Sequence, residues 1–83
     1  METTIANSFE TTDLWLAAFL KTSRVSFNGS RRLNGIVYFM FSDPDVCQRL
    51  IDEYFQGGLV QANELKTSIN FFRDVIFSKN ANT

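Results

Sequence analysis

The sequence predicts a small α+β protein in which one helix is followed by an antiparallel β-hairpin and then by two further helices (αββαα). Three observations support this prediction: a capped apolar stretch at residues 14–20, an Asn-Gly pair followed by a β-branched and aromatic run at 36–41, and two later segments with apolar residues at helical spacing. The chain has 83 residues, enough for one domain. We therefore expect a single domain over residues 9–78, with frayed ends at 1–8 and 79–83.

The first helix is predicted from its capping residues. Thr11, Thr12 and Asp13 offer an N-cap and negative charge at the helix start. The following stretch is apolar on nearly all sides, which favours a helix that is buried on several sides. We expect this helix to run to about Thr22, to be the central helix and to place Trp15 in the core.

Residues 25–42 predict two strands joined by a tight turn. Asn-Gly occurs at 28–29 and at 34–35. The second pair directly precedes the apolar run and is the better two-residue hairpin turn, which makes Gly29 a β-bulge. A turn at the first pair stays an alternative.

A turn at 34–35 fixes which residues face each other, before any bulge shifts the register: Leu33 with Ile36, Arg32 with Val37 and Arg31 with Tyr38. Val37, Phe39 and Phe41 then share one face of the second strand. Ile36, Tyr38 and Met40 share the other face, so both faces are apolar. Helices on one side cannot cover both, and we expect a homodimer formed through the hairpin to cover the Tyr38 and Met40 face.

Two helices are predicted after the hairpin. Ser42 or Asp43 can cap the first of them, Pro44 fits its first position, and residues 57–58, both glycine, end it. Leu59 and Val60 are expected to add a very short strand or to fill the core. The last helix is expected over about residues 61–78, where apolar residues recur at helical spacing: Leu65, Ile69, Phe72 and Ile76.

Two runs of residues resemble the pattern of a family of short, uncharacterised prokaryotic proteins. Members of this family share a T-D-L-x-L-A-A-[FY]-L start and a hydrophobic strand that ends in F-x-D, and they are grouped as a domain of unknown function. The likeness covers about residues 9–78 and includes Gly57 and the last helix. It implies a prokaryotic source and assigns no activity. The matching runs are Thr12-Asp13-Leu14-Trp15-Leu16-Ala17-Ala18-Phe19-Leu20 and Val37-Tyr38-Phe39-Met40-Phe41-Ser42-Asp43.

The composition argues against an enzyme. The chain contains no histidine, the side chain that titrates nearest neutral pH and the commonest metal ligand. Cys47 lies on an apolar helix face, where a cysteine behaves as a small buried hydrophobe. Asp43 and Asp45 lie where a helix start favours negative charge, while residues 52–53 fall on a polar helix face. We expect no catalytic residue, no metal and no cofactor.

The hairpin region is locally basic, because no acidic residue lies between Asp13 and Asp43. Arginines beside aromatic rings are typical of sites that contact phosphates and unpaired bases. Basic residues on exposed strands also discourage edge-to-edge association, which is the structural alternative. The candidate contact residues for nucleic acid or another partner are Lys21, Arg24, Phe27, Arg31, Arg32, Tyr38 and Met40.

The expected function is that of a small non-enzymatic binding or regulatory module that acts through protein–protein contact or homodimerisation. A nucleic-acid-binding protein that uses the basic hairpin is one alternative, and a phage- or defence-associated inhibitor is another. A net charge of −1 gives no general attraction to polyanions. The single cysteine, the lack of a long apolar run and the unpatterned residues 1–8 predict a cytoplasmic protein without membrane contact.

Overall fold

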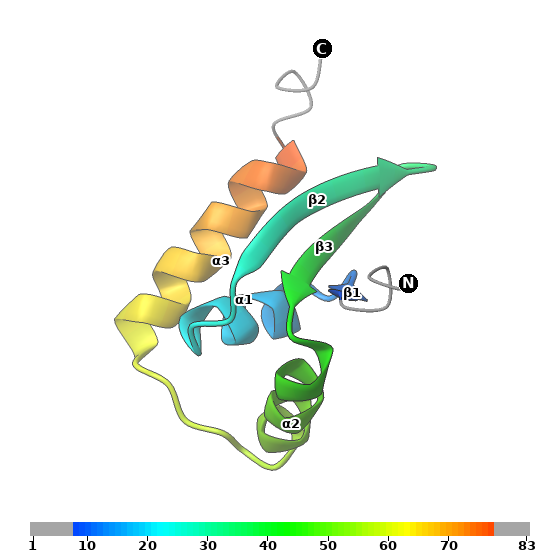
Figure 1. Cartoon of the computed structure of the whole chain (residues 1–83). Coiled ribbons are helices and arrows are strands. Elements are labelled where there is room, and N and C mark those ends of the chain that lie inside the picture. Colours follow the sequence, from blue (N-terminus) through cyan, green and yellow to red (C-terminus); the bar gives the residue numbers. More distant parts are fainter. Residues whose placement is uncertain (1–7, 78–83) are drawn as a thin grey trace.

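The computed structural model describes residues 8–77, which form three strands and three helices (Figure 1). The α+β fold class is confirmed, and so is the order of helix, hairpin, helix, helix within it. Of the predicted frayed ends at 1–8 and 79–83, all residues except Ser8 lie outside the described residues. In chain order the elements are β1 (Ser8–Thr11), α1 (Leu14–Thr22), β2 (Phe27–Leu33), β3 (Ile36–Ser42), α2 (Pro44–Phe55) and α3 (Ala62–Phe77).

The sheet contains one strand more than the sequence predicted. Its order is β1-β3-β2, and both pairings are antiparallel. β1 begins at Ser8, a residue that the prediction had placed in the frayed end, and Phe9 of β1 faces Phe41 of β3. A four-residue strand gives too short an alternation to be recognised, and its partner lies far along the chain. β3 is therefore the middle strand, hydrogen-bonded on both sides.

The hairpin turn and the bulge are where the sequence placed them. Asn34 and Gly35 have φ values of 54° and 81°, so both central residues are left-handed, as a type I′ turn requires. The three predicted pairings next to the turn, between residues 31–33 and 36–38, are confirmed. The register shifts between Phe27 and Gly29, and Gly29 has a φ of 118°, which confirms the bulge.

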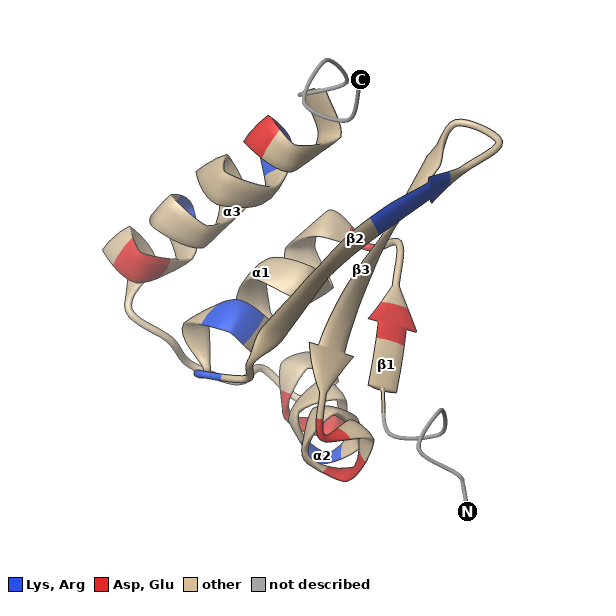
Figure 2. Ribbon diagram, turned by 45° about the horizontal axis from the view of Figure 1, so that its top comes forward, with Lys and Arg blue, Asp and Glu red and all other residues tan. Residues whose placement is uncertain are grey.

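The sheet has an inner face that packs on the helices. Phe39 and Phe41 of β3 are buried there, and the ring of Phe72 in α3 lies 4.8 Å from the Phe39 ring and 5.0 Å from the Phe27 ring. Figures 1 and 2 show α1 behind the strands, α3 alongside β2 and α2 beyond the end of β3. The opposite face, which carries residues 36, 38 and 40 of β3, does not contribute to the core.

The capping of α1 follows the prediction, but the position of its tryptophan does not. The carboxylate of Asp13 accepts hydrogen bonds from the backbone N–H groups of Trp15 and Leu16. Residues 16–20 are all buried, so the expected central helix is confirmed. The prediction that Trp15 lies in the core is wrong, since its side chain is 54% exposed. Trp15 lies in the first turn of α1, before the buried residues 16–20, so the neighbouring elements do not cover it.

The start of α2 differs in its capping from the prediction. Pro44 occupies the first turn as expected, but Asp43 is left-handed, with a φ of 57°, and its side chain makes no capping hydrogen bond. An N-cap normally has extended backbone, which brings its side chain over the free N–H groups. The hydroxyl of Ser42, the other predicted cap, donates instead to the side-chain oxygen of Asn28.

The connection between α2 and α3 turns outward rather than into the core. Leu59 is 94% exposed and residues 59–60 form no strand, so both predicted alternatives for Leu59 are wrong. The reason lies at Gly58, whose N–H donates to the carbonyl of Glu53 and whose added Cβ would lie 3.1 Å from the ring of Phe19. The glycine backbone itself packs against α1, and the next residue points away.

Candidate functional site

The structure separates the seven predicted contact residues into three places. Lys21 and Arg24 lie at the end of α1, and Figure 2 shows them apart from the two arginines of β2. Phe27 and Arg32 face Phe41 and Val37, so they lie on the inner side of the sheet. The remaining three share the outer face. The residues therefore do not form one continuous basic surface. The outer-face members are Arg31, Tyr38 and Met40.

On the outer face, Arg31 is already paired with an acid that the sequence analysis did not connect with it. Its Nε and Nη2 atoms donate to the two carboxylate oxygens of Glu10 in β1, over 3.2 Å and 3.0 Å. The guanidinium carbon lies 4.4 Å from the ring centroid of Tyr38, a cation–π contact. The hydrogen bond from Arg31 holds the pKa of Glu10 below its ordinary value, and the same bond raises the pKa of Arg31.

The aliphatic part of the outer face is exposed and lies at the end of the hairpin. Leu33 and Ile36 pair with each other beside the turn and are 50% and 48% exposed. Figure 1 shows this end of the hairpin reaching beyond the helices. We call six side chains of this face the outer-face patch: Glu10, Arg31, Leu33, Ile36, Tyr38 and Met40.

Two of the predicted contact residues have structural partners instead. Arg32 donates from Nη2 to the carbonyl of Ile76 over 2.8 Å, where a cation complements the C-terminal end of α3. The ring of Phe27 packs edge-on against those of Phe71 and Phe72. Both side chains therefore join the hairpin to α3.

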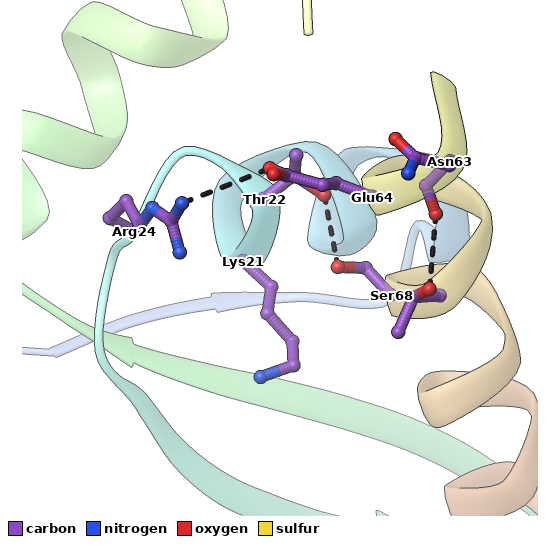
Figure 3. A pocket seen from close by; sticks show the side chains of 7 residues that line it. Lys21, Thr22, Arg24, Asn63, Glu64 and Ser68 are labelled. Atoms are coloured by element: carbon purple, nitrogen blue, oxygen red, sulfur yellow. Dashed lines mark hydrogen bonds and ion pairs between the residues drawn. The ribbon is translucent and has the colours of Figure 1, made fainter. Parts of the chain in front are cut away.

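Lys21 and Arg24 line a polar pocket of about 330 Å³ between α1 and α3 (Figure 3). Arg24 Nη2 lies 3.9 Å from Glu64 Oε1, and Lys21 Nζ lies 4.7 Å from the ring centroid of Phe71. Lys21 thus has a partner within the chain, while the side chain of Arg24 stays 82% exposed beside Glu64. Within the pocket, the hydroxyl of Thr22 in α1 donates to the hydroxyl of Ser68 in α3 over 2.9 Å, which links the two helices. The other lining residues are Asn63 and Thr67.

The side chains that could serve catalysis or bind a metal have structural roles instead. Cys47 is fully buried, as predicted, and its Sγ donates to the carbonyl of Ser42 over 3.3 Å. Burial raises the pKa of this thiol, which disfavours the thiolate. Within residues 8–77, no three His, Cys, Asp or Glu side chains lie together in a way that could hold a metal ion.

Three residues of the outer-face patch were not among the predicted contact residues. Leu33 and Ile36 could have been found, because the predicted pairing already places them on the same face as Tyr38. Glu10 could not, because its strand was not predicted.

No family model, curated protein or solved structure matches the chain. The resemblance to the prokaryotic family of unknown function therefore stays a prediction. Of the helices in the described part of the chain, none combines the length and the apolar character needed to cross a membrane.

Proposed function

We propose that the protein is a non-enzymatic binding module that acts through protein–protein contact at its outer-face patch. One observation carries this proposal: half-exposed Leu33 and Ile36 lie side by side on the sheet face that the described helices leave uncovered. Next to them lie an aromatic ring and an arginine, residue types that are enriched where protein interfaces contribute most to affinity. An apolar centre with a charged rim is the usual composition of such a contact.

The charges favour a protein over a nucleic acid as the partner. Binding to a phosphate backbone depends on cations that are free to replace counterions. Arg31 is neutralised by Glu10, Arg32 is bound to the end of α3, and Arg24 lies near Glu64. The basic residues between Asp13 and Asp43 therefore lie apart from one another in the fold, and acidic side chains neutralise part of their charge.

The non-enzymatic part of the proposal rests on the roles that reactive side chains already have. The thiol of Cys47 is buried and poorly ionised, and Asp13 caps α1. Glu10 is bound by two hydrogen bonds to Arg31. None of these groups combines exposure with an activating neighbour, which a nucleophile or general base needs.

Site-specific photocrosslinking in cells tests the proposal. A benzophenone amino acid replaces Ile36 in one variant and Phe55 in a matched control, because Phe55 is 75% exposed at the end of α2 and lies outside the outer-face patch. We expect light-dependent adducts to protein from position 36 and few from position 55. Adducts to nucleic acid alone, or equal yields at both positions, would contradict the proposal.

A further inference from the structure

We infer that the partner of the outer-face patch is a second copy of the same chain, bound across a two-fold axis with Arg31 of each copy reaching Glu10 of the other. This inference rests on the proposed function and adds the identity of the partner.

The charges of the patch make it complementary to itself. A two-fold interface brings the same surface of both copies together, so that a residue i contacts j and j contacts i. A patch with charges of one sign would then repel itself. This patch carries one cation and one carboxylate, Arg31 and Glu10, whose side chains remain 45% and 35% exposed although they are paired. Their bonds can therefore be exchanged with those of a second copy at no net loss of ion pairs.

The apolar side chains are arranged in a stripe that can pack against the same stripe of a second copy. Ile36, Tyr38 and Met40 lie on one face of β3, about 6.6 Å apart from one residue to the next. If the two-fold axis runs along β3, Ile36, Tyr38 and Met40 each meet the same residue of the other copy, and β2, which carries Arg31, faces β1 of the other copy, which carries Glu10. The exposed end of each hairpin would then lie against the exposed end of its partner.

The bulge leaves room for this contact. Gly29 is the β2 residue that faces Met40, and an added Cβ at Gly29 would have no atom within 4 Å. The space beside Met40 on that side is therefore open.

Reversal of single charges tests the inference. We expect sedimentation velocity to show a dimer of the unmodified protein within the micromolar to millimolar range. Arg31→Glu and Glu10→Arg should each be monomeric, because each variant then places charges of one sign on both sides of the axis. An equimolar mixture of the two variants should form a 1:1 heterodimer in native mass spectrometry, since one chain carries two carboxylates and the other two cations.

Matched controls separate the interface from general charge effects. Arg49→Glu and Glu53→Arg make the same changes of net charge at exposed positions of α2 and should leave the dimer unchanged. Circular dichroism checks that each variant is folded. If a single variant fails to fold, the double variant Glu10→Arg/Arg31→Glu restores the pair within one chain and should dimerise like the unmodified protein.

The outcomes distinguish this inference from the proposed function. A monomer at millimolar concentration would overturn the second copy as partner. Single variants that dimerise like the unmodified protein would overturn the exchanged Arg31–Glu10 pairs at this patch. If the protein is monomeric and position 36 still crosslinks to a different protein, the proposed function stands and this inference fails.

Discussion

Arg31 in β2 and Glu10 in β1 are joined by two hydrogen bonds that cross over β3, the strand between them. The guanidinium of Arg31 lies over the ring of Tyr38, a residue of this middle strand. The pair therefore links the two outer strands of the sheet directly and covers part of the face that the helices leave open.

Replacing Arg31 should change the titration of its partner. In Arg31→Gln the pKa of Glu10 is expected to rise toward its ordinary value, because the hydrogen bond from Arg31 is what lowers it. A group with a lowered folded-state pKa stabilises the fold above its unfolded pKa, and this contribution is lost as the pH falls through the folded pKa. Acidification should thus destabilise the unmodified protein more than Arg31→Gln. Carbon-detected NMR titration of the Glu10 carboxyl measures the shift, and an unchanged pKa in Arg31→Gln would contradict it.

The two aspartates at helix starts should differ in their effect on stability. Asp13→Ala removes two hydrogen bonds to the first turn of α1 and should lower the free energy of unfolding by about 1 kcal/mol. Asp43→Asn should be nearly neutral, since Asp43 makes no side-chain cap and asparagine tolerates its left-handed backbone. Urea unfolding followed by circular dichroism compares them. Equal losses in both variants would show that capping is not the cause.

The hairpin turn should require glycine at one position only. Gly35 has a φ of 81°, and an alanine held in left-handed backbone costs about 1–2 kcal/mol. Gly35→Ala should therefore lower the free energy of unfolding by that amount. Asn34→Gly is the matched control, because a type I′ turn accepts glycine at both central positions. A Gly35→Ala variant as stable as the unmodified protein would argue against this turn type.

The thiol of Cys47 should react only when the domain opens. It is fully buried and its pKa is raised, so a thiol reagent at neutral pH should modify the folded protein far more slowly than the protein in urea. Cys47→Ala combined with Ser30→Cys moves the thiol to an exposed strand position and should react at the rate of a free thiol. Fast modification of Cys47 in the folded protein would contradict its burial.

Much of the fold was predictable because local signals determine it. The Asn-Gly pair at 34–35 fixed the turn and the register, and Asp13 marked the start of α1. Gly29 indicated the bulge, since a glycine inside a strand pattern has few other uses. In each of these cases a few residues that are neighbours in the sequence determine the local structure.

The errors have causes that lie outside the local sequence. β1 is too short to show a pattern and exists because β3 offers it a partner. The exposure of Trp15 and Leu59 depends on where the neighbouring elements end, which apolar character alone does not encode. The basic region of the sequence became partly neutral in space because Glu10 and Glu64 approach from other elements.

The position of β1 gives the order in which the sheet assembles. β2 and β3 are joined by a two-residue turn, and a hairpin of this kind forms within about 1–10 μs. Thr11 and Phe39 must instead meet across a helix and a strand, and such distant pairings form late. β1 is therefore the strand that can leave while the hairpin stays. Its departure takes Glu10 away and leaves Arg31 unpaired, so that fraying of a single strand converts the outer face from neutral to cationic.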